Sequence, residues 1–267
     1  MSEPKDDSSP PLVVWFRRDL RVVDNPALAS AAAGGHPVIP LFVLEAAPDG
    51  RPLGAAAKWW LDGSLRALDA ELRALGSRLV LRQGEASDVV RQLARETGAA
   101  CVLLNRRYEP AAVARDAALE SSLDAAGIEV VSCNAALLTE PWEVLTGADT
   151  PYKVFTPYWR AARGRIDEAP LKPSPRALIA PKHWPKSDDL DAWGLRPKKP
   201  DWSVGFDWTP GEGGALTRLD HFIDHGLAGY AGGRDLPAED GSSRLSPHLR
   251  WGEIGPRRSG ALDRPPQ

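Results

Sequence analysis

The chain has 267 residues, with 33 Lys and Arg against 36 Asp and Glu, which gives a formal net charge of −3. This length suits one large domain or two smaller ones, and 43% hydrophobic with 26% charged residues is ordinary for a soluble globular protein. The overall charge gives no argument for nucleic-acid binding, and two cysteines, Cys101 and Cys133, are too few for a disulfide framework. No apolar run is long enough to span a bilayer. We therefore expect a cytoplasmic monomer without membrane contacts.

The N-terminal segment 1–11, MSEPKDDSSPP, is polar and contains no apolar core. A signal peptide or a membrane anchor needs such a core, so neither is expected here. We predict a disordered tail.

Residues 12–135 alternate between short apolar runs and stretches with helical periodicity. Five strands are predicted, at 12–16, 37–45, 78–84, 99–105 and 128–134. Helices are predicted after Asp24 or Asn25 as the cap, and then over 58–75, 86–97 and 113–126. Near-continuous apolar strands that alternate with helices indicate an α/β fold, a five-stranded parallel Rossmann-like sheet covered on both faces.

Ligands of such sheets bind at the carboxyl ends of the strands. The first loop at that edge is RRDLRVVDN, which carries Arg17, Arg18 and Arg21. No G-x-G-x-x-G follows the first strand, so a nicotinamide dinucleotide site of the usual type is not expected. Two interpretations remain for the arginines: they bind a phosphate compound, or they brace the loop through ion pairs with Asp19 and Asp24.

The composition changes in the segment 136–211. Eleven prolines and six tryptophans lie between positions 141 and 210, and between 151 and 200 there are eleven Lys and Arg against five Asp and Glu. So much aromatic surface predicts an ordered connector that packs over other elements. The basic residues form either a phosphate-facing strip or a solvated surface. From position 212 onward the pattern is helical again.

The stretch GSSRLSPHLRWGEIGPR, at 241–257, places three serines and an arginine before an expected helix. Serine hydroxyls and free backbone N–H groups can hold a diphosphate, and Arg244 can add charge or pair with an acid. Ser246 followed by Pro247 is typical of a helix cap and first turn. The alternative is a plain helix start with a surface ion pair.

Three blocks, VVWFRRDLRVVDNPAL, TPYKVFTPYWRAA and GSSRLSPHLRWGEIGPR, resemble the DNA photolyase/cryptochrome family, and most of all bacterial class I cyclobutane pyrimidine dimer photolyases. The resemblance covers about 12–256. It implies an α/β domain at 12–135, a connector at 136–211 and the start of an all-α FAD-binding domain at 212–267. The implied activity is light-driven repair of UV-damaged DNA by reduced FAD, a carbon–carbon lyase reaction, often with a second, light-harvesting chromophore.

The resemblance also implies a set of flavin-binding residues: Tyr230, Ser242, Ser243, Arg244, Leu245 and Ser246. DNA-contact candidates in the connector are Lys153, Arg160 and Arg163. The family's other flavin contacts, its dimer cavity and its electron relay lie downstream of GEIGPR, so no catalytic residue is expected in this chain, and no metal site. The tail RRSGALDRPPQ departs from the family's helical pattern and indicates a truncated or out-of-frame end. We therefore expect this chain alone to be inactive and its apolar side chains after Glu212 to be poorly covered.

Folate-binding members carry an Asn-Glu pair where this chain has Ala111 and Ala112. Two alanines cannot hold a pterin ring, so we expect weak folate binding or none, and the antenna stays unassigned. Two alternative functions remain at this point. One is a cryptochrome-like blue-light signalling flavoprotein, and the other is a stand-alone α/β nucleotide-binding module that uses the RRDLR loop.

Overall fold

A computed structural model describes residues 9–47, 51–166, 171–236 and 238–260, and it contains one five-stranded sheet within them. The strands are β1 (Leu12–Phe16), β2 (Val38–Leu44), β3 (Val80–Gln83), β4 (Cys101–Asn105) and β5 (Glu129–Cys133). All neighbouring strands are parallel, in the order β3-β2-β1-β4-β5. The predicted five-stranded parallel sheet is therefore confirmed.

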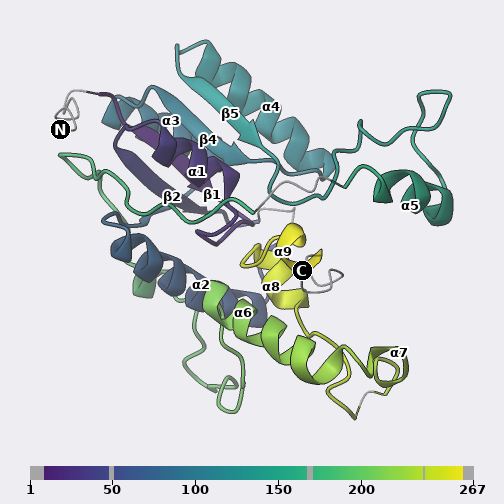
Figure 1. The fold of residues 1–267 in the computed structure, drawn as a ribbon. Coiled ribbons are helices and arrows are strands. Elements are labelled where there is room, and N and C mark those ends of the chain that lie inside the picture. The colour runs from purple at the N-terminus through teal and green to yellow at the C-terminus, as the bar shows by residue number, and fades with distance from the viewer. Residues whose placement is uncertain (1–8, 48–50, 167–170, 237, 261–267) are drawn as a thin grey trace, which may run out of the picture.

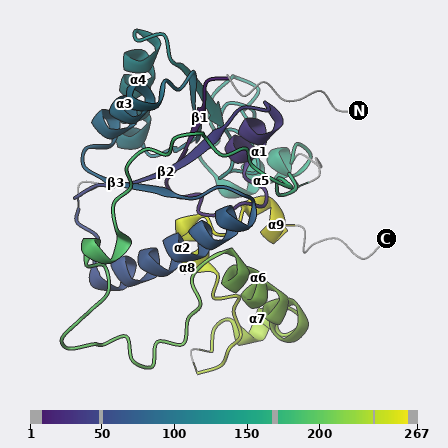
Figure 2. The ribbon, with the colours of Figure 1, turned by 90° about the vertical axis from the view of Figure 1, so that its left-hand side faces the viewer.

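Helices cover both faces of the sheet (Figures 1 and 2). Side chains alternate along each strand, so Val14 and Phe16 of β1 join one buried cluster while Val13 and Trp15 join the other. The first cluster is covered by α1 (Pro26–Ala33) and α2 (Ala55–Ala74), and the second by α3 (Ala86–Thr97) and α4 (Pro110–Asp124).

The helix ends follow the local chemistry of the sequence. The Asn25 side chain accepts a hydrogen bond from the Leu28 amide at 3.1 Å and Pro26 occupies the first turn, so Asn25 is the cap of α1. Gly98 ends α3 in the left-handed conformation with φ of 64°. Two predicted bounds were wrong by a few residues, because α2 begins at Ala55 and α4 at Pro110.

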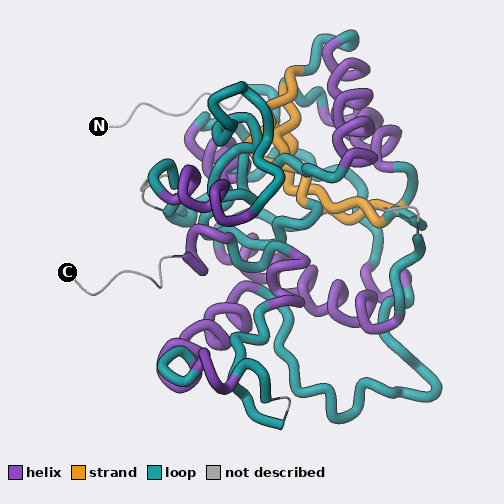
Figure 3. The backbone as a smooth tube through the Cα atoms, turned by 90° about the vertical axis from the view of Figure 1, so that its right-hand side faces the viewer, coloured by secondary structure: helices purple, strands orange, loops and turns teal. Residues whose placement is uncertain are grey.

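The connector is largely irregular chain, which Figure 3 draws in teal wherever it occurs, and its part around Leu178 and Ile179 lies along the α/β domain. The Val38 amide donates to the Ile179 carbonyl at 2.8 Å, and the Leu178 amide donates to the Leu75 carbonyl at 2.7 Å. Its regular elements in the described part are α5 (Phe155–Arg163), which projects from the body in Figure 1, and the short 3₁₀ helix η1 (Leu190–Trp193). The connector is thus tied to the domain by backbone hydrogen bonds.

The C-terminal segment is helical, with α6 (Glu212–His221), a π-helical turn η2 (Phe222–Gly226), α7 (Tyr230–Gly233), α8 (Ser246–Trp251) and α9 (Pro256–Gly260). α6 runs alongside α2, and α8 lies between the sheet domain and α6 (Figure 1). Among the described helices, none has the length and apolar character that a membrane crossing requires.

The expectation of poorly covered apolar side chains after Glu212 was wrong for four of these side chains. Relative exposures are 7% for Phe222, 4% for Leu245, 6% for Trp251 and 3% for Ile254. Trp251 joins the main core, and Leu245 and Ile254 pack with α6, so the chain's own earlier elements bury them. Ile223 and Leu249, which also belong to that set, are exposed as expected.

Glu253 anchors this segment to the α/β domain. Its side chain is fully buried, and its Oε1 accepts hydrogen bonds from the Trp60 indole at 3.0 Å, from the Gly211 amide at 2.8 Å and from the Ser64 hydroxyl. Oε2 hydrogen-bonds with Nδ1 of His248. A buried carboxylate needs such partners, so one side chain fixes α2, the connector end and α8 together.

Candidate functional site

The order of strands in the sheet locates one candidate site. The chain runs outward from β1 to β3 on one side and continues with β4 and β5 on the other, so the strand order reverses between β1 and β4. Ligands of open α/β sheets bind at the carboxyl ends of the strands at this point. A cavity of about 610 Å³ opens there, lined by residues that include Asn105, Arg106, Arg107, Tyr108 and Arg250.

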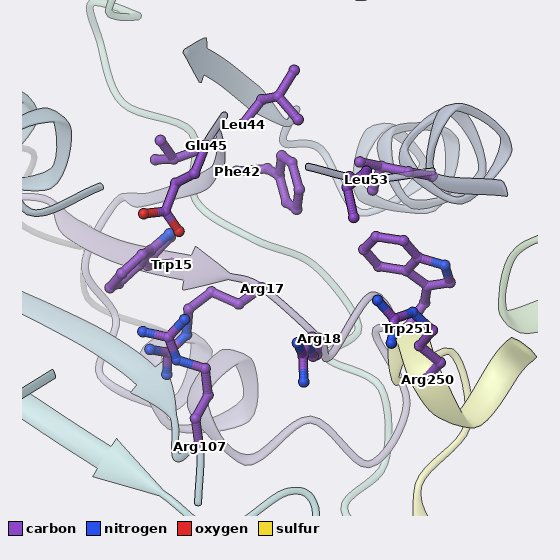
Figure 4. A pocket seen from close by; sticks show the side chains of 12 residues that line it. Trp15, Arg17, Arg18, Phe42, Leu44, Glu45, Leu53, Arg107, Arg250 and Trp251 are labelled. Atoms are coloured by element: carbon purple, nitrogen blue, oxygen red, sulfur yellow. The ribbon is translucent and has the colours of Figure 1, made fainter. Parts of the chain in front are cut away.

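A second, narrow cavity of about 60 Å³ adjoins it and shares Arg18, Arg107 and Arg250 as lining residues. Figure 4 shows Trp15, Phe42, Leu53 and Trp251 forming its apolar walls, with the Glu45 carboxylate beside Trp15. Burial raises the pKa of Glu45, and the nearby Arg115 guanidinium opposes this rise.

The arginines of the RRDLR loop are mostly structural. Arg17 is buried and pairs with Asp116 on α4 at 2.7 Å. Arg21 is buried and donates to the carbonyls of Asp24, Ala135 and Gly252 at 2.7–2.9 Å. The interpretation as loop bracing is therefore correct for these two, although their main partners are Asp116 and backbone carbonyls.

Arg18 is the partly exposed member of the loop and pairs with Glu109, next to the shared cavities. The two alanines at the family's folate positions lie at the start of α4, where Ala111 is exposed and Ala112 is buried. Both present only methyl groups, so the folate expectation stays a prediction. The cysteines are free thiols; Cys101 is buried, whereas Cys133, on β5, is only half-buried.

The second candidate site is the serine loop, which we define as residues 240–246. Ser242 and Arg244 are exposed, Ser243 is half-buried and Leu245 is anchored in the apolar cluster beneath α6. Arg244 adopts a left-handed backbone with φ of 49°, and its guanidinium pairs with Asp240 at 2.9 Å. Sequence reasoning foresaw that Arg244 could pair with an acidic partner.

Tyr230 opens α7 and is 40% exposed, with its ring packed edge-on against Phe222 at 5.7 Å between centroids. α7 and the serine loop meet through glycines: a Cβ added to Gly241 would lie 2.4 Å from the Gly233 carbonyl. Only glycine permits this close approach, which brings the segment that begins with Tyr230 next to the loop.

The expected cap of the following helix was wrong by one residue. Ser246 is the first residue of α8, Leu245 occupies the N-cap position, and no side chain caps the helix there. Ser246 is exposed, and its hydroxyl does not cap the helix. α8 has six residues, so its dipole adds little to anion binding.

Sequence reasoning missed Arg218 on α6. Its Nε donates to the Ser243 carbonyl at 3.0 Å and its Nη2 donates to the Ser242 carbonyl at 3.1 Å. Its two terminal nitrogens also hold both carboxylate oxygens of Asp240, one at 2.8 Å. No local spacing links position 218 to the loop, since the contact forms only when α6 lies beneath it.

The basic candidates of the connector lie on α5 or just before it. Lys153 is exposed just before α5, and Arg160 and Arg163 are exposed on that helix. The rings of Phe155 and Trp159 stack on the same helix at 6.2 Å, with an interplanar angle of 10°, and both are exposed.

Comparisons with known proteins identify the family to which this architecture belongs. The model of the family described as DNA photolyase matches residues 12–177. A deoxyribodipyrimidine photo-lyase from Agrobacterium fabrum is 50% identical over 249 residues, which are 92% of this chain and 51% of that protein. Cryptochrome-1 from Arabidopsis thaliana is 37% identical over 254 residues, covering 92% of this chain and 37% of that protein.

Among solved structures, a bacterial class III photolyase from Agrobacterium tumefaciens superposes with a TM-score of 0.89 at 47% identity, over 96% of this chain and 53% of that one. The doubly wound sheet, the packed connector and the helical segment thus form one half of a photolyase-like architecture. The chain belongs to the DNA photolyase family. It spans about half the length of the relatives that it matches, and this solved relative is described as class III, whereas the sequence motifs were assigned to class I.

Proposed function

We propose that the chain is the N-terminal half of a deoxyribodipyrimidine photo-lyase, which repairs cyclobutane pyrimidine dimers in UV-damaged DNA with light. The observation that carries this proposal is the family match together with 50% identity to a photo-lyase along nearly the whole chain. We also propose that the functional units divide at 135/136 and 211/212. The class III relative favours that subgroup over class I.

The serine loop supplies the diphosphate end of a FAD site in this proposal. Exposed hydroxyls on Ser242 and Ser246 and the exposed guanidinium of Arg244 are donors suited to an anionic diphosphate. The half-buried Ser243 belongs to the same loop, the segment that begins with Tyr230 lies next to it, and Leu245 fixes it to the core. When bound, reduced FAD supplies the electron that splits the dimer after light absorption; the residues of this chain bind and orient its diphosphate.

The exposed segment around α5 is the proposed DNA-phosphate contact. Lys153, Arg160 and Arg163 place three positive charges within eleven positions of the chain, without acidic neighbours in α5. Contacts of this kind position DNA without reading its sequence and weaken as salt rises.

The strand-end cavities are the proposed site of a second chromophore. Aromatic walls from Trp15, Phe42 and Trp251 suit a flat heteroaromatic ring, and the adjacent arginines suit an acidic group on it. Folate is not expected there, because Ala111 and Ala112 replace the pair that holds it elsewhere in the family. Stoichiometric methenyltetrahydrofolate on the purified protein would contradict this part.

The second candidate function is blue-light signalling, which the similarity to Cryptochrome-1 favours. A stand-alone phosphate-binding module is disfavoured, since Arg17 and Arg21 are committed to structural contacts. The two photochemical functions separate in a photolyase-deficient bacterium. We would express a hybrid in which residues 1–256 replace the matching half of the Agrobacterium photo-lyase. Survival after UV that depends on subsequent blue light supports repair, whereas a flavin-loaded hybrid without such survival contradicts it.

A further inference from the structure

The serine loop is held by two side chains outside the six flavin-binding residues that the resemblance implies: the guanidinium of Arg218 on α6 and the carboxylate of Asp240, the first residue of the loop. Arg218 is largely buried, with a side-chain exposure of 19%, and reaches the loop from the middle of α6. It uses Nε for the Ser243 carbonyl and Nη2 for the Ser242 carbonyl, at 3.0 and 3.1 Å. Two successive carbonyls of the loop therefore point toward one side chain.

Asp240 completes the arrangement. Its two carboxylate oxygens accept hydrogen bonds from the two terminal nitrogens of Arg218, and its Oδ1 also pairs with Arg244 Nε at 2.9 Å. Two-pronged guanidinium–carboxylate contacts fix orientation as well as distance. The carboxylate thus links the residue that holds the carbonyls with the residue whose charge faces solvent.

This arrangement has a consequence for ligand binding. Arg218 draws the carbonyls of Ser242 and Ser243 to the α6 side of the loop, so these acceptors are withdrawn from the side where an anion would bind. Arg244 is held at φ of 49°, and successive peptide units that combine right-handed and left-handed conformations form anion-binding concavities of N–H groups. A free carbonyl at such a site would repel a diphosphate.

We propose that Arg218 and Asp240 are positioning residues that orient the serine loop for the diphosphate of a dinucleotide. The proposal rests on the proposed flavin site and extends it to two residues that do not touch the ligand. Arg218 acts through the carbonyls of Ser242 and Ser243, and Asp240 acts through Arg218 and Arg244.

The sharpest test is Asp240→Ala, because simple electrostatics and the positioning role predict opposite results. Removal of a negative charge beside an anion site should tighten anion binding if charge alone matters. Loss of the brace should weaken it. Asp235→Ala is the matched control, since Asp235 is an exposed acid in the same inter-helix segment, and its ion pair in the described part of the chain is a long one, at 3.7 Å from Arg234.

ADP is the probe for the diphosphate end, titrated into the purified full chain and followed through backbone amide shifts and the ³¹P shift of the β-phosphate. We expect the Ser243 and Arg244 amides to move in the unmodified chain. Asp240→Ala and Arg218→Ala should raise the Kd for ADP at least fivefold, Arg218→Lys should restore part of the affinity, and Asp235→Ala should bind as well as or better than the unmodified chain. The ³¹P shift at saturation should move toward its free value in Arg218→Ala.

Three results would overturn the proposal in distinguishable ways. If ADP moves the loop amides but Asp240→Ala binds equally or more tightly, the positioning role is wrong and the flavin site stands. If ADP does not change the shifts of these amides in the unmodified chain, the proposed flavin site is wrong, and the positioning role that rests on it is rejected as well. If Arg218→Ala and Asp240→Ala also lose the native shifts of Trp251 and Glu253, their effect is on folding of the segment, and the positioning role is again rejected.

Discussion

Glu253 offers a direct test of how the helical segment is held on the α/β domain. Glu253→Ala removes the acceptor of the Trp60 indole and the Gly211 amide, whereas the Ser64 hydroxyl keeps a second partner in the Trp60 carbonyl at 3.0 Å. Each buried donor left without a partner costs about 1–3 kcal/mol, so the docked state should lose about 4 kcal/mol. Glu253→Gln retains the Oε1 acceptor and should lose only about 1 kcal/mol.

The Leu20 amide reports this docking, because it donates to the Trp251 carbonyl at 3.0 Å. In native-state hydrogen exchange, a loss of about 4 kcal/mol corresponds to a fall in its protection of about a thousandfold. Glu239→Ala, at an exposed position, is the control and should leave protection unchanged. A fall of less than tenfold in Glu253→Ala would refute the view that this carboxylate anchors the segment.

Three further outcomes are expected. Gly252 and Gly98 share a φ of 64°, but a Cβ added to Gly252 would lie 2.0 Å from the Arg18 carbonyl oxygen, while nothing lies within 4 Å of one added to Gly98. In urea unfolding, Gly98→Ala should lower the free energy of unfolding by about 1–2 kcal/mol and Gly252→Ala by clearly more. Equal losses in the two variants would contradict the docking of Gly252 against Arg18. Burial and the neighbouring Glu212 carboxylate raise the pKa of Glu71 to about 7, above its ordinary value. The contribution of Glu71 to stability is therefore complete at low pH and lost as pH rises to about 7. Glu71→Gln should lessen the fall in unfolding free energy between pH 5 and 8, and an unchanged dependence of that free energy on pH would refute this assignment. Alanine at all three exposed basic positions of the α5 segment should weaken binding of UV-damaged DNA. The slope of log K against log salt should become shallower by about 0.9 for each phosphate that these side chains no longer neutralise. An unchanged slope would show that the segment is not part of the DNA interface. These positions are Lys153, Arg160 and Arg163.

The sheet and its helices could be predicted from the sequence because each signal is local. Buried parallel strands appear as short apolar runs such as 101–105, and Asn25 and Gly98 mark helix ends by their own chemistry. The strand order had no such local signal. The order depends on which strands pair across the sheet, and the location of the cavity at the ends of β1 and β4 depends on the same pairing.

The candidate site was predictable where motifs carry it and unpredictable where distant segments meet. The serine loop was identified from its motif together with the family resemblance, but the residue that holds it, Arg218, lies 25 positions before Ser243. The burial of Trp251 and Ile254 was also missed, because it depends on α2, α6 and the loop after β1. Long-range packing of this kind leaves no periodic pattern in the segment that is buried.

Our central proposal is that this chain forms half of a light-driven DNA repair enzyme. Its most direct test counts cyclobutane dimers in UV-irradiated DNA incubated with the flavin-loaded hybrid of residues 1–256 and the second half of the Agrobacterium photo-lyase. We expect dimers to disappear under blue light and to persist in the dark. Dimers that persist in the light, although the hybrid holds reduced flavin and binds the DNA, would contradict the claim.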